Sequence, residues 1–167
     1  IDALSSAVED GLEQDVLVFS GGSSVGERDL ILDVIAAKGE VLFHGVAVKP
    51  GKPTALGRIR NRLVFGMPGY PTSCLSNAYI LLAPALRRIA RLPDQIIRTL
   101  TLPLGARVVS VPGRHQFYTV RIEYGTAMPA FKASGDITSM SRADGYIEIA
   151  PDVTIVEKDT PVDVTFF

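Results

Sequence analysis

The first half of the chain is organised around the stretch Asp15-Val-Leu-Val-Phe-Ser20-Gly21-Gly22-Ser23-Ser24-Val25-Gly26-Glu27-Arg28-Asp29. Its apolar run, Val16 to Phe19, has no polar side, which predicts a strand covered on both faces in a parallel or mixed sheet. The glycines and serines of Ser20 to Gly26 let the backbone turn sharply and point several N–H groups at one ligand. The stretch therefore predicts a strand, a glycine loop and a helix that together hold an anion or a nucleotide.

The loop by itself does not identify that ligand. Ser-Gly-Gly-Ser-Ser-Val-Gly matches neither the dinucleotide fingerprint nor the P-loop, which requires Lys-Ser/Thr after its last glycine. A generic tight strand-to-helix turn explains it about equally well. Glu27 and Asp29 come where the next helical pattern starts, so they either cap that helix or hold a cation beside a bound phosphate. For Asp29 the simpler alternative is a first-turn acid facing the helix dipole, worth about 0.3–1 kcal/mol.

Composition excludes several classes of protein. The chain has 167 residues, of which 47% are hydrophobic and 21% charged, as in an ordinary globular protein. A net charge of −1 argues against a nucleic-acid partner, and the longest apolar stretch, Ala78 to Leu86, is too short to span a membrane. We therefore expect a cytoplasmic protein. Its one cysteine, Cys74, is expected to be a buried small hydrophobe, and its two histidines, His44 and His115, are expected to be hydrogen-bonded or surface residues.

The periodicity of the chain predicts two domains. Helical spacing at Leu30 to Ile35 ends at Lys38-Gly39, a strand expected to be buried follows at Glu40 to His44, and a hairpin reverses at Asn61. A further helix is expected to start at Pro71 and to bend at Pro84. From Leu92-Pro93-Asp94 onward, short alternating runs replace the helical ones, as in a small barrel or sandwich. We predict an α/β domain at residues 1–92 and an all-β barrel domain at residues 93–167.

The first residues of the chain are predicted to belong to a helix. Ile1, Leu4 and Val8 fall on one helical face that ends at Gly11, so the chain is expected to be a fragment that starts inside its first domain. Such a fragment would leave a strand edge unpaired and an apolar face uncovered. We expect these 167 residues alone not to catalyse a reaction.

Four motifs, in this order and spacing, resemble the molybdopterin molybdenumtransferases, a family that includes the E domain of gephyrin. The motifs are Ser20-Gly-Gly-Ser-Ser-Val-Gly-Glu-Arg-Asp29, Gly39-Glu-Val-Leu-Phe-His44, Val48-Lys-Pro-Gly-Lys-Pro-Thr54 and Phe65-Gly-Met-Pro-Gly-Tyr-Pro71. The tail, with Gly113-Arg-His-Gln-Phe117, Ser134 to Ser139 and Arg142-Ala-Asp-Gly145, resembles the C-terminal β-barrel of the family. The resemblance implies a three-layer α/β pterin-binding domain, truncated at its start, followed by that barrel. Tyr70 departs from the asparagine usual in the Pro-Gly-Asn-Pro motif.

The resemblance also implies a reaction and a site. It implies a transferase of molybdenum cofactor biosynthesis that inserts molybdate into molybdopterin or adenylylated molybdopterin, with release of AMP, help from Mg²⁺ and a homodimeric intact protein. It gives Asp29 the catalytic and metal-binding roles. The implied substrate-binding residues are Ser20, Gly21, Gly22, Ser23, Gly26, Lys49, Lys52, Pro68, Gly69 and Pro71.

The chemistry of these residues agrees with that implication in outline. A pterin phosphate, an adenylate and molybdate are anions, which loop N–H groups and cations can hold. Composition alone predicts that Lys49 and Lys52 belong to a solvated basic turn. The prolines in their loop stiffen it, however, so that both ammonium groups could face one anion. Because ligands of open α/β sheets bind beyond the carboxyl ends of strands, the loops at Ser20, Lys49 and Pro68 are expected to converge. The alternative is a non-catalytic pterin-binding or scaffolding module with the same fold.

Overall fold

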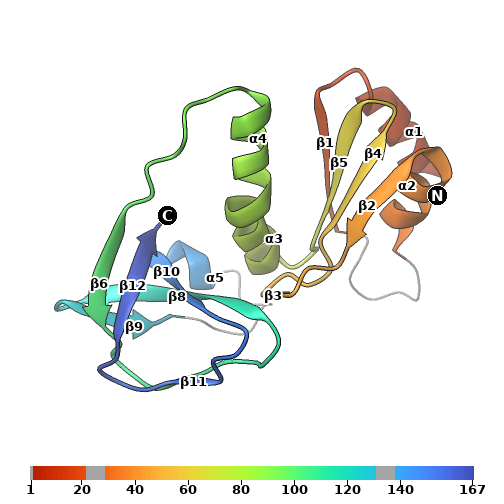
Figure 1. The fold of residues 1–167 in the computed structure, drawn as a ribbon. Helices are drawn as coiled ribbons and strands as arrows, with labels where there is room; N and C mark the ends of the chain where they lie inside the picture. The colour runs from red at the N-terminus through yellow and green to blue at the C-terminus, as the bar shows by residue number, and fades with distance from the viewer. Residues whose placement is uncertain (1, 22–28, 131–137) are drawn as a thin grey trace. The chain divides into compact units, whose positions relative to one another are not determined.

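The computed structural model describes residues 2–21, 29–130 and 138–167, and it divides into two compact units (Figure 1). Unit 1 comprises Ile1–Val46 and Gly51–Pro84, and unit 2 comprises Ala47–Pro50 and Ala85–Phe167. The predicted boundary between residues 92 and 93 falls inside unit 2 and stays a prediction. No helix among the described residues is long and apolar enough to cross a membrane.

Unit 1 is built on a four-stranded sheet in the order β1-β5-β4-β2. Its strands are β1 (Val16–Ser20), β2 (Glu40–His44), β4 (Ala55–Ile59) and β5 (Arg62–Met67). The β1 strand pairs with β5 in parallel, whereas β4 is antiparallel to both β5 and β2. The predicted hairpin is confirmed, because Ile59 pairs with Arg62 and Arg60 adopts the left-handed φ of 53° that a tight turn requires.

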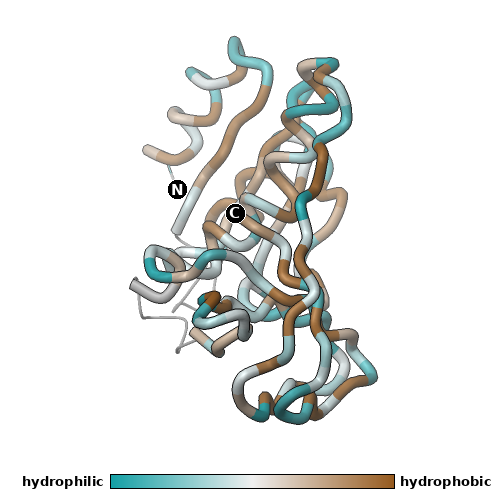
Figure 2. Tube along the Cα trace, turned by 90° about the vertical axis from the view of Figure 1, so that its left-hand side faces the viewer, coloured by the Kyte–Doolittle hydropathy of each residue, from teal (hydrophilic) through white to brown (hydrophobic). Residues whose placement is uncertain are grey.

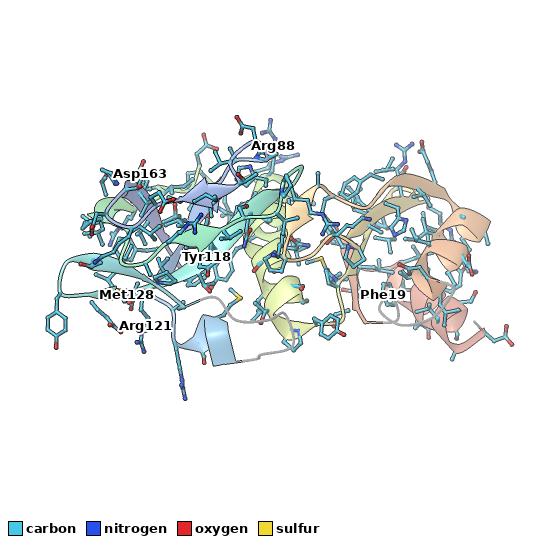
Figure 3. The ribbon with its side chains drawn as sticks, turned by 90° about the horizontal axis from the view of Figure 1, so that it is seen from below. Phe19, Arg88, Tyr118, Arg121, Met128 and Asp163 are labelled. Carbon is cyan, nitrogen blue, oxygen red and sulfur yellow. The ribbon has the colours of Figure 1, made fainter. Side chains whose placement is uncertain are left out.

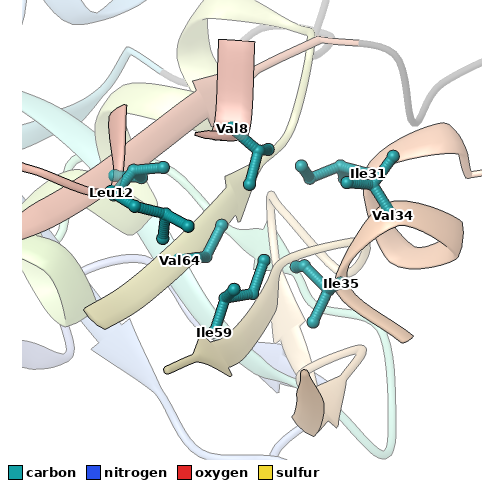
Figure 4. Close-up of a cluster of buried hydrophobic side chains, with 8 residues drawn as sticks. Val8, Leu12, Ile31, Val34, Ile35, Ile59 and Val64 are labelled. Carbon is teal, nitrogen blue, oxygen red and sulfur yellow. The ribbon is translucent and has the colours of Figure 1, made fainter. Parts of the chain in front are cut away.

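Two helices, α1 (Asp2–Gly11) and α2 (Leu30–Lys38), cover one face of this sheet. The sheet contributes Leu17, Ile59 and Val64 to the core that they bury (Figure 4). The helices contribute Val8 of α1 and Ile31, Val34 and Ile35 of α2, and Leu12, the residue just after α1, completes the core. A glycine in β4 allows α2 to approach closely, since a Cβ on Gly57 would lie 2.3 Å from Cγ2 of Ile35.

The predicted burial of two strands is wrong. On β1, an unbroken hydrophobic run in Figure 2, Leu17 is buried but Val18 is 46% exposed. On β2, Val41 and Leu42 are both exposed. The physical reason is that both strands lie at the edges of the sheet and that the described core joins the sheet only to α1 and α2. The α/β character is confirmed, while the third layer of the domain stays a prediction.

A continuous helical stretch follows β5. It begins at Pro71, as predicted, and consists of α3 (Pro71–Asn77), a π-helical segment η1 (Ala78–Leu82) and α4 (Ala83–Ile89). Pro84 lies just after the π-helical segment and has no backbone N–H to donate. The π-helical turn, which is wider than an α-helical one, therefore lies where a regular helix would lose a hydrogen bond.

Unit 2 is dominated by strands, as predicted. A six-stranded sheet runs in the order β3-β8-β10-β12-β6, with β9 paired to β8, and β7 pairs with β11 separately. These pairs are antiparallel, apart from the parallel pair β3–β8. The bounds are β3 (Val48–Lys49), β6 (Thr99–Pro103), β7 (Val108–Val109), β8 (His115–Glu123), β9 (Thr126–Pro129), β10 (Gly145–Ile149), β11 (Ile155–Val156) and β12 (Pro161–Phe166), with a short helix α5 (Thr138–Ser141).

This sheet has its own core but is not a closed barrel in the part of the chain that the structure describes. Leu104, Val120, Ile147 and Val164 are among its fully buried residues, and Tyr118 of β8 packs against them (Figure 3). A barrel requires a continuous ladder between its first and last strands. Here a single bridge links Leu104, just after β6, to a residue of β9, so the described strands form an open path.

Ile35 should be the most sensitive contact of α2. It is fully buried between the helix and Gly57, so Ile35→Ala removes packed methyl groups and should lower the free energy of unfolding by about 2–5 kcal/mol. Ile35→Val should cost only about 0.5–1.5 kcal/mol. Urea denaturation measures both values. Leu30→Ala on the same helix is the control, because Leu30 is exposed, and an equal loss in this variant would contradict the observed packing.

Candidate functional site

The glycine loop and the Pro68 loop leave the sheet of unit 1 side by side. The parallel register places Ser20, the last residue of β1, opposite Met67, the last residue of β5. The N–H of Gly21 then donates to the Met67 carbonyl at 3.4 Å. Gly21 has a φ of +89° and open space where a Cβ would lie, so its backbone is accessible. Two of the three loops expected to converge therefore start together.

The end of β2 reaches the same edge. His44 pairs with Ala55, and Ala55 pairs in turn with Gly66, next to Met67. Because β4 runs antiparallel to its neighbours, the residue before it, Thr54, lies at the edge where β1, β2 and β5 end. This edge, defined by Ser20, His44, Thr54 and Met67, is called the carboxyl edge below.

Asp29 lies at the carboxyl edge, next to His44. Its Oδ2 is 3.9 Å from Nε2 of His44, and its Oδ1 is buried without a hydrogen-bond partner among the described atoms. Asp29 occupies the N-cap position of α2, but its side chain makes no capping hydrogen bond. Its backbone carbonyl, in contrast, accepts the N–H of Asp33 at 3.2 Å. The carboxylate therefore does not perform the capping task that the simpler alternative assigned to it.

The turn that precedes β4 is held by a buried amide, Asn77 of α3. Its Nδ2 donates to the Gly51 carbonyl at 2.8 Å and also to Oγ1 of Thr54. Oγ1 of Thr54 donates to the same carbonyl at 2.9 Å. On the other side, the N–H groups of Gly45 and Val46 donate to the carbonyls of Thr54 and Lys52, both at 2.9 Å. Residues 51–54 are therefore fixed from two directions.

Sequence reasoning missed Asn77, although a signal was present. The helix α3 buries small polar residues at helical spacing and exposes apolar ones, the reverse of the expected pattern. Leu75 is 48% exposed, and Tyr79 in the following segment is 46% exposed. The buried set is Thr72, Ser73, Ser76 and Asn77.

The two predicted lysines are in different units. Lys52 is exposed in the turn of unit 1, whereas Lys49 is half-buried in β3 of unit 2 and pairs in register with Gln116 of β8. That both face one anion stays a prediction. The predicted contacts of Gly22, Ser23 and Gly26 lie outside the described residues.

The Pro68–Pro71 segment shows what the tyrosine at position 70 changes. Pro68 is buried, Gly69 and Tyr70 are exposed, and Pro71 opens α3. Tyr70 is the N-cap, and its carbonyl accepts the N–H of Cys74 at 2.9 Å, but it makes no side-chain cap. An asparagine could accept a helix N–H through its side chain.

Other reactive groups of the described residues do not add a second centre. Burial raises the pKa of the Cys74 thiol, which disfavours the nucleophilic thiolate, and the side chain is half-buried rather than fully buried as expected. Within residues 2–21, 29–130 and 138–167, no group of three or more His, Cys, Asp and Glu side chains could hold a metal ion. His44 and Asp29 form a pair only.

Comparisons with known proteins agree with this architecture. Residues 1–88, more than half of the chain, match the family described as "Probable molybdopterin binding domain", and residues 101–167 match "MoeA C-terminal region (domain IV)". The "Putative molybdopterin biosynthesis protein MJ0666" of Methanocaldococcus jannaschii is 34% identical over 98% of the chain and 39% of its own length. "Molybdopterin molybdenumtransferase 2" of Mycobacterium tuberculosis is 28% identical over 92% of the chain and 40% of its own length.

A solved structure is similar across both units. The molybdopterin biosynthesis moeA protein from Pyrococcus horikoshii superposes with a TM-score of 0.81 at 41% identity, over 98% of this chain and 40% of that one. Fold and matches define a molybdopterin-binding α/β domain joined to a MoeA C-terminal region. The chain belongs to the molybdopterin molybdenumtransferase (MoeA) family. It spans about 40% of the length of these relatives.

The position of Asp29 predicts an unusual effect on stability. Asp29→Asn removes a buried charge that caps nothing, so the free energy of unfolding should stay within about 0.5 kcal/mol of wild type or rise. Asp33→Asn is the control, because this exposed first-turn acid should stabilise the helix dipole by about 0.3–1 kcal/mol. Urea denaturation of both variants checks this. Asp29→Ala, which would also remove any cap, should lose less than about 0.5 kcal/mol, and a loss of about 1 kcal/mol or more in this variant would show that the carboxylate serves the helix.

Proposed function

We propose that the chain binds molybdopterin at the carboxyl edge, as part of a molybdenum cofactor biosynthesis enzyme that inserts molybdate into adenylylated molybdopterin and releases AMP. The observation that carries the proposal is Asp29, which brings a carboxylate to the edge where the Gly21 and Pro68 loops begin, with one buried oxygen that has no hydrogen-bond partner among the described atoms. A structural acid at a helix start would use that oxygen for a cap. Family membership supports the pterin as the substrate class.

In this proposal, some residues of the candidate site hold the anionic ligand and another holds a cation. The ammonium of Lys52 suits the phosphate of the pterin or the adenylate, whereas the N–H of Gly21 is already donated to Met67. Asp29 fits Mg²⁺, because a hard cation prefers carboxylate oxygen and Oδ1 has no hydrogen-bond partner in the described part of the chain. When bound, Mg²⁺ would neutralise charge on phosphoryl oxygens and polarise them.

A binding or scaffolding module with this fold is the second candidate. It would bind molybdopterin without hydrolysing the adenylylated form, so the two functions differ in AMP release. Asp29 favours the enzyme, since its buried Oδ1 has no hydrogen-bond partner among the described atoms and a scaffold would gain nothing from that desolvation cost. The homodimer and the cytoplasmic location stay predictions.

Lys52→Ala should weaken molybdopterin binding by about 10-fold, as expected for losing one charge-assisted contact to a phosphate. Titration of the 167-residue chain with molybdopterin, followed by pterin fluorescence, measures the affinity. Lys158→Ala, a lysine in a turn of unit 2, is the matched control for net charge and should bind like wild type. Equal affinity of wild type and Lys52→Ala would remove Lys52 from the site, and no binding by wild type would refute the proposed function.

Asp29→Asn should separate the effect of the cation on ligand affinity from the binding of the pterin itself. Without a cation, its affinity for adenylylated molybdopterin should stay within about 3-fold of wild type, because the amide removes a nearby negative charge and keeps the size of the side chain. With Mg²⁺, the wild-type chain should bind about 10-fold more tightly and the variant should gain little. Titrations with and without Mg²⁺, at constant ionic strength, measure this difference. The same Mg²⁺ enhancement in the variant would assign the cation to other groups.

A further inference from the structure

The helix α3 contacts the turn at residues 51–54 through hydrogen bonds of one buried amide, whereas helix packing alone requires only apolar contacts. Asn77 is fully buried and places its amide against the Gly51 carbonyl and the Thr54 hydroxyl. Its Oδ1 has no hydrogen-bond partner among the described atoms. A buried amide that is only partly satisfied costs free energy, and an apolar residue would fill a helix position without that cost. The amide is therefore explained by what it holds.

The turn is shaped to receive this amide. Gly51 has a φ of +109°, and a Cβ there would lie 2.1 Å from Nδ2 of Asn77. Glycine is thus required by both the backbone conformation and the close approach. Thr54 is also fully buried and closes the turn by donating to the Gly51 carbonyl. Lys52, between them, is exposed, so a rigid backbone carries a cation that faces solvent.

We propose that Asn77 is a positioning residue, which fixes the Gly51–Thr54 turn and thereby holds the Lys52 ammonium in place for the phosphate of the pterin. The inference rests on the proposed function and names a residue that acts through Lys52 without touching the ligand. Holding the turn before the ligand arrives removes part of the ordering cost of binding. Loss of Asn77 should therefore reduce the benefit of Lys52, rather than remove an independent contact.

The first experiment tests the turn without any ligand. The N–H groups of Gly45 and Val46 donate to the carbonyls of Thr54 and Lys52, so their hydrogen exchange reports whether the turn opens. Residue-resolved exchange should be at least about 10-fold faster at both amides in Asn77→Leu than in wild type. Thr54→Val, which removes one acceptor of the amide and keeps the shape, should show a smaller increase and serves if Asn77→Leu does not fold.

Ser73→Ala is the matched control for this experiment. Ser73 is buried in the same helix and has no described hydrogen bond to residues 51–54. Its removal should leave exchange at Gly45 and Val46 unchanged. Unchanged exchange in both Asn77→Leu and Thr54→Val would overturn the proposal, and equal acceleration in Ser73→Ala would reduce Asn77 to a general packing residue.

The second experiment links the turn to binding through a double-mutant cycle. Molybdopterin affinity is measured for wild type, Lys52→Ala, Asn77→Leu and the double variant. In the wild-type background Lys52→Ala should weaken binding about 10-fold, and in the Asn77→Leu background less than about 2-fold. A purely structural asparagine would leave the Lys52 effect at about 10-fold in both backgrounds, and this result would overturn the positioning role.

The two experiments separate this inference from the proposed function. If the wild-type chain does not bind molybdopterin, the proposed function fails and the binding role of Asn77 fails with it. The exchange result then still decides whether Asn77 holds the turn. If the wild type binds and the cycle is additive, the proposed function stands and the positioning role alone is refuted.

Discussion

The parallel pairing of β1 with β5 is the constraint on which unit 1 depends. It sets Leu17 beside Val64, and both face the helices. A slip of one residue would turn Leu17 away from the core and bring Val18 into its place. The same register ends both strands at the same level, where Gly21 bonds to Met67. Burial on one face of the sheet therefore also determines which loops meet at the carboxyl edge.

The strands and helices of unit 1 could be predicted from sequence because their signals are local. The apolar run of β1, the helical spacing before Lys38-Gly39 and the proline that opens α3 each fix an element without reference to the rest of the fold. Burial could not be read in this way. Whether Val18 or Leu42 is covered depends on what packs on the second face of the sheet and on strand order, which are tertiary properties.

For the candidate site, the structure gives the positions of the predicted residues, and their roles stay predictions. Motif order directed attention to Asp29 and Lys52, and the structure places Asp29 at the carboxyl edge and Lys52 in a fixed turn. Motif order could not identify Asn77, and the small polar residues at helical spacing around it mark only a face of α3. The meaning of Asn77 comes from a turn 26 positions earlier in the chain, whose carbonyl needs a donor.

Two costly polar groups among the described residues of unit 1 belong to the candidate site or to the turn beside it. Asp29 and Asn77 each bury an oxygen without a described partner, and each belongs to an element that packs on the carboxyl edge or its turn. Proteins depart from rules of polar satisfaction mainly where function requires it, and the cost is carried by stability elsewhere. Here the core formed by Ile35, Ile59 and Val64 on the sheet's helical face can carry that cost. The roles differ, since Asp29 leaves an oxygen available for a ligand, whereas Asn77 uses its donors to hold the backbone that carries Lys52.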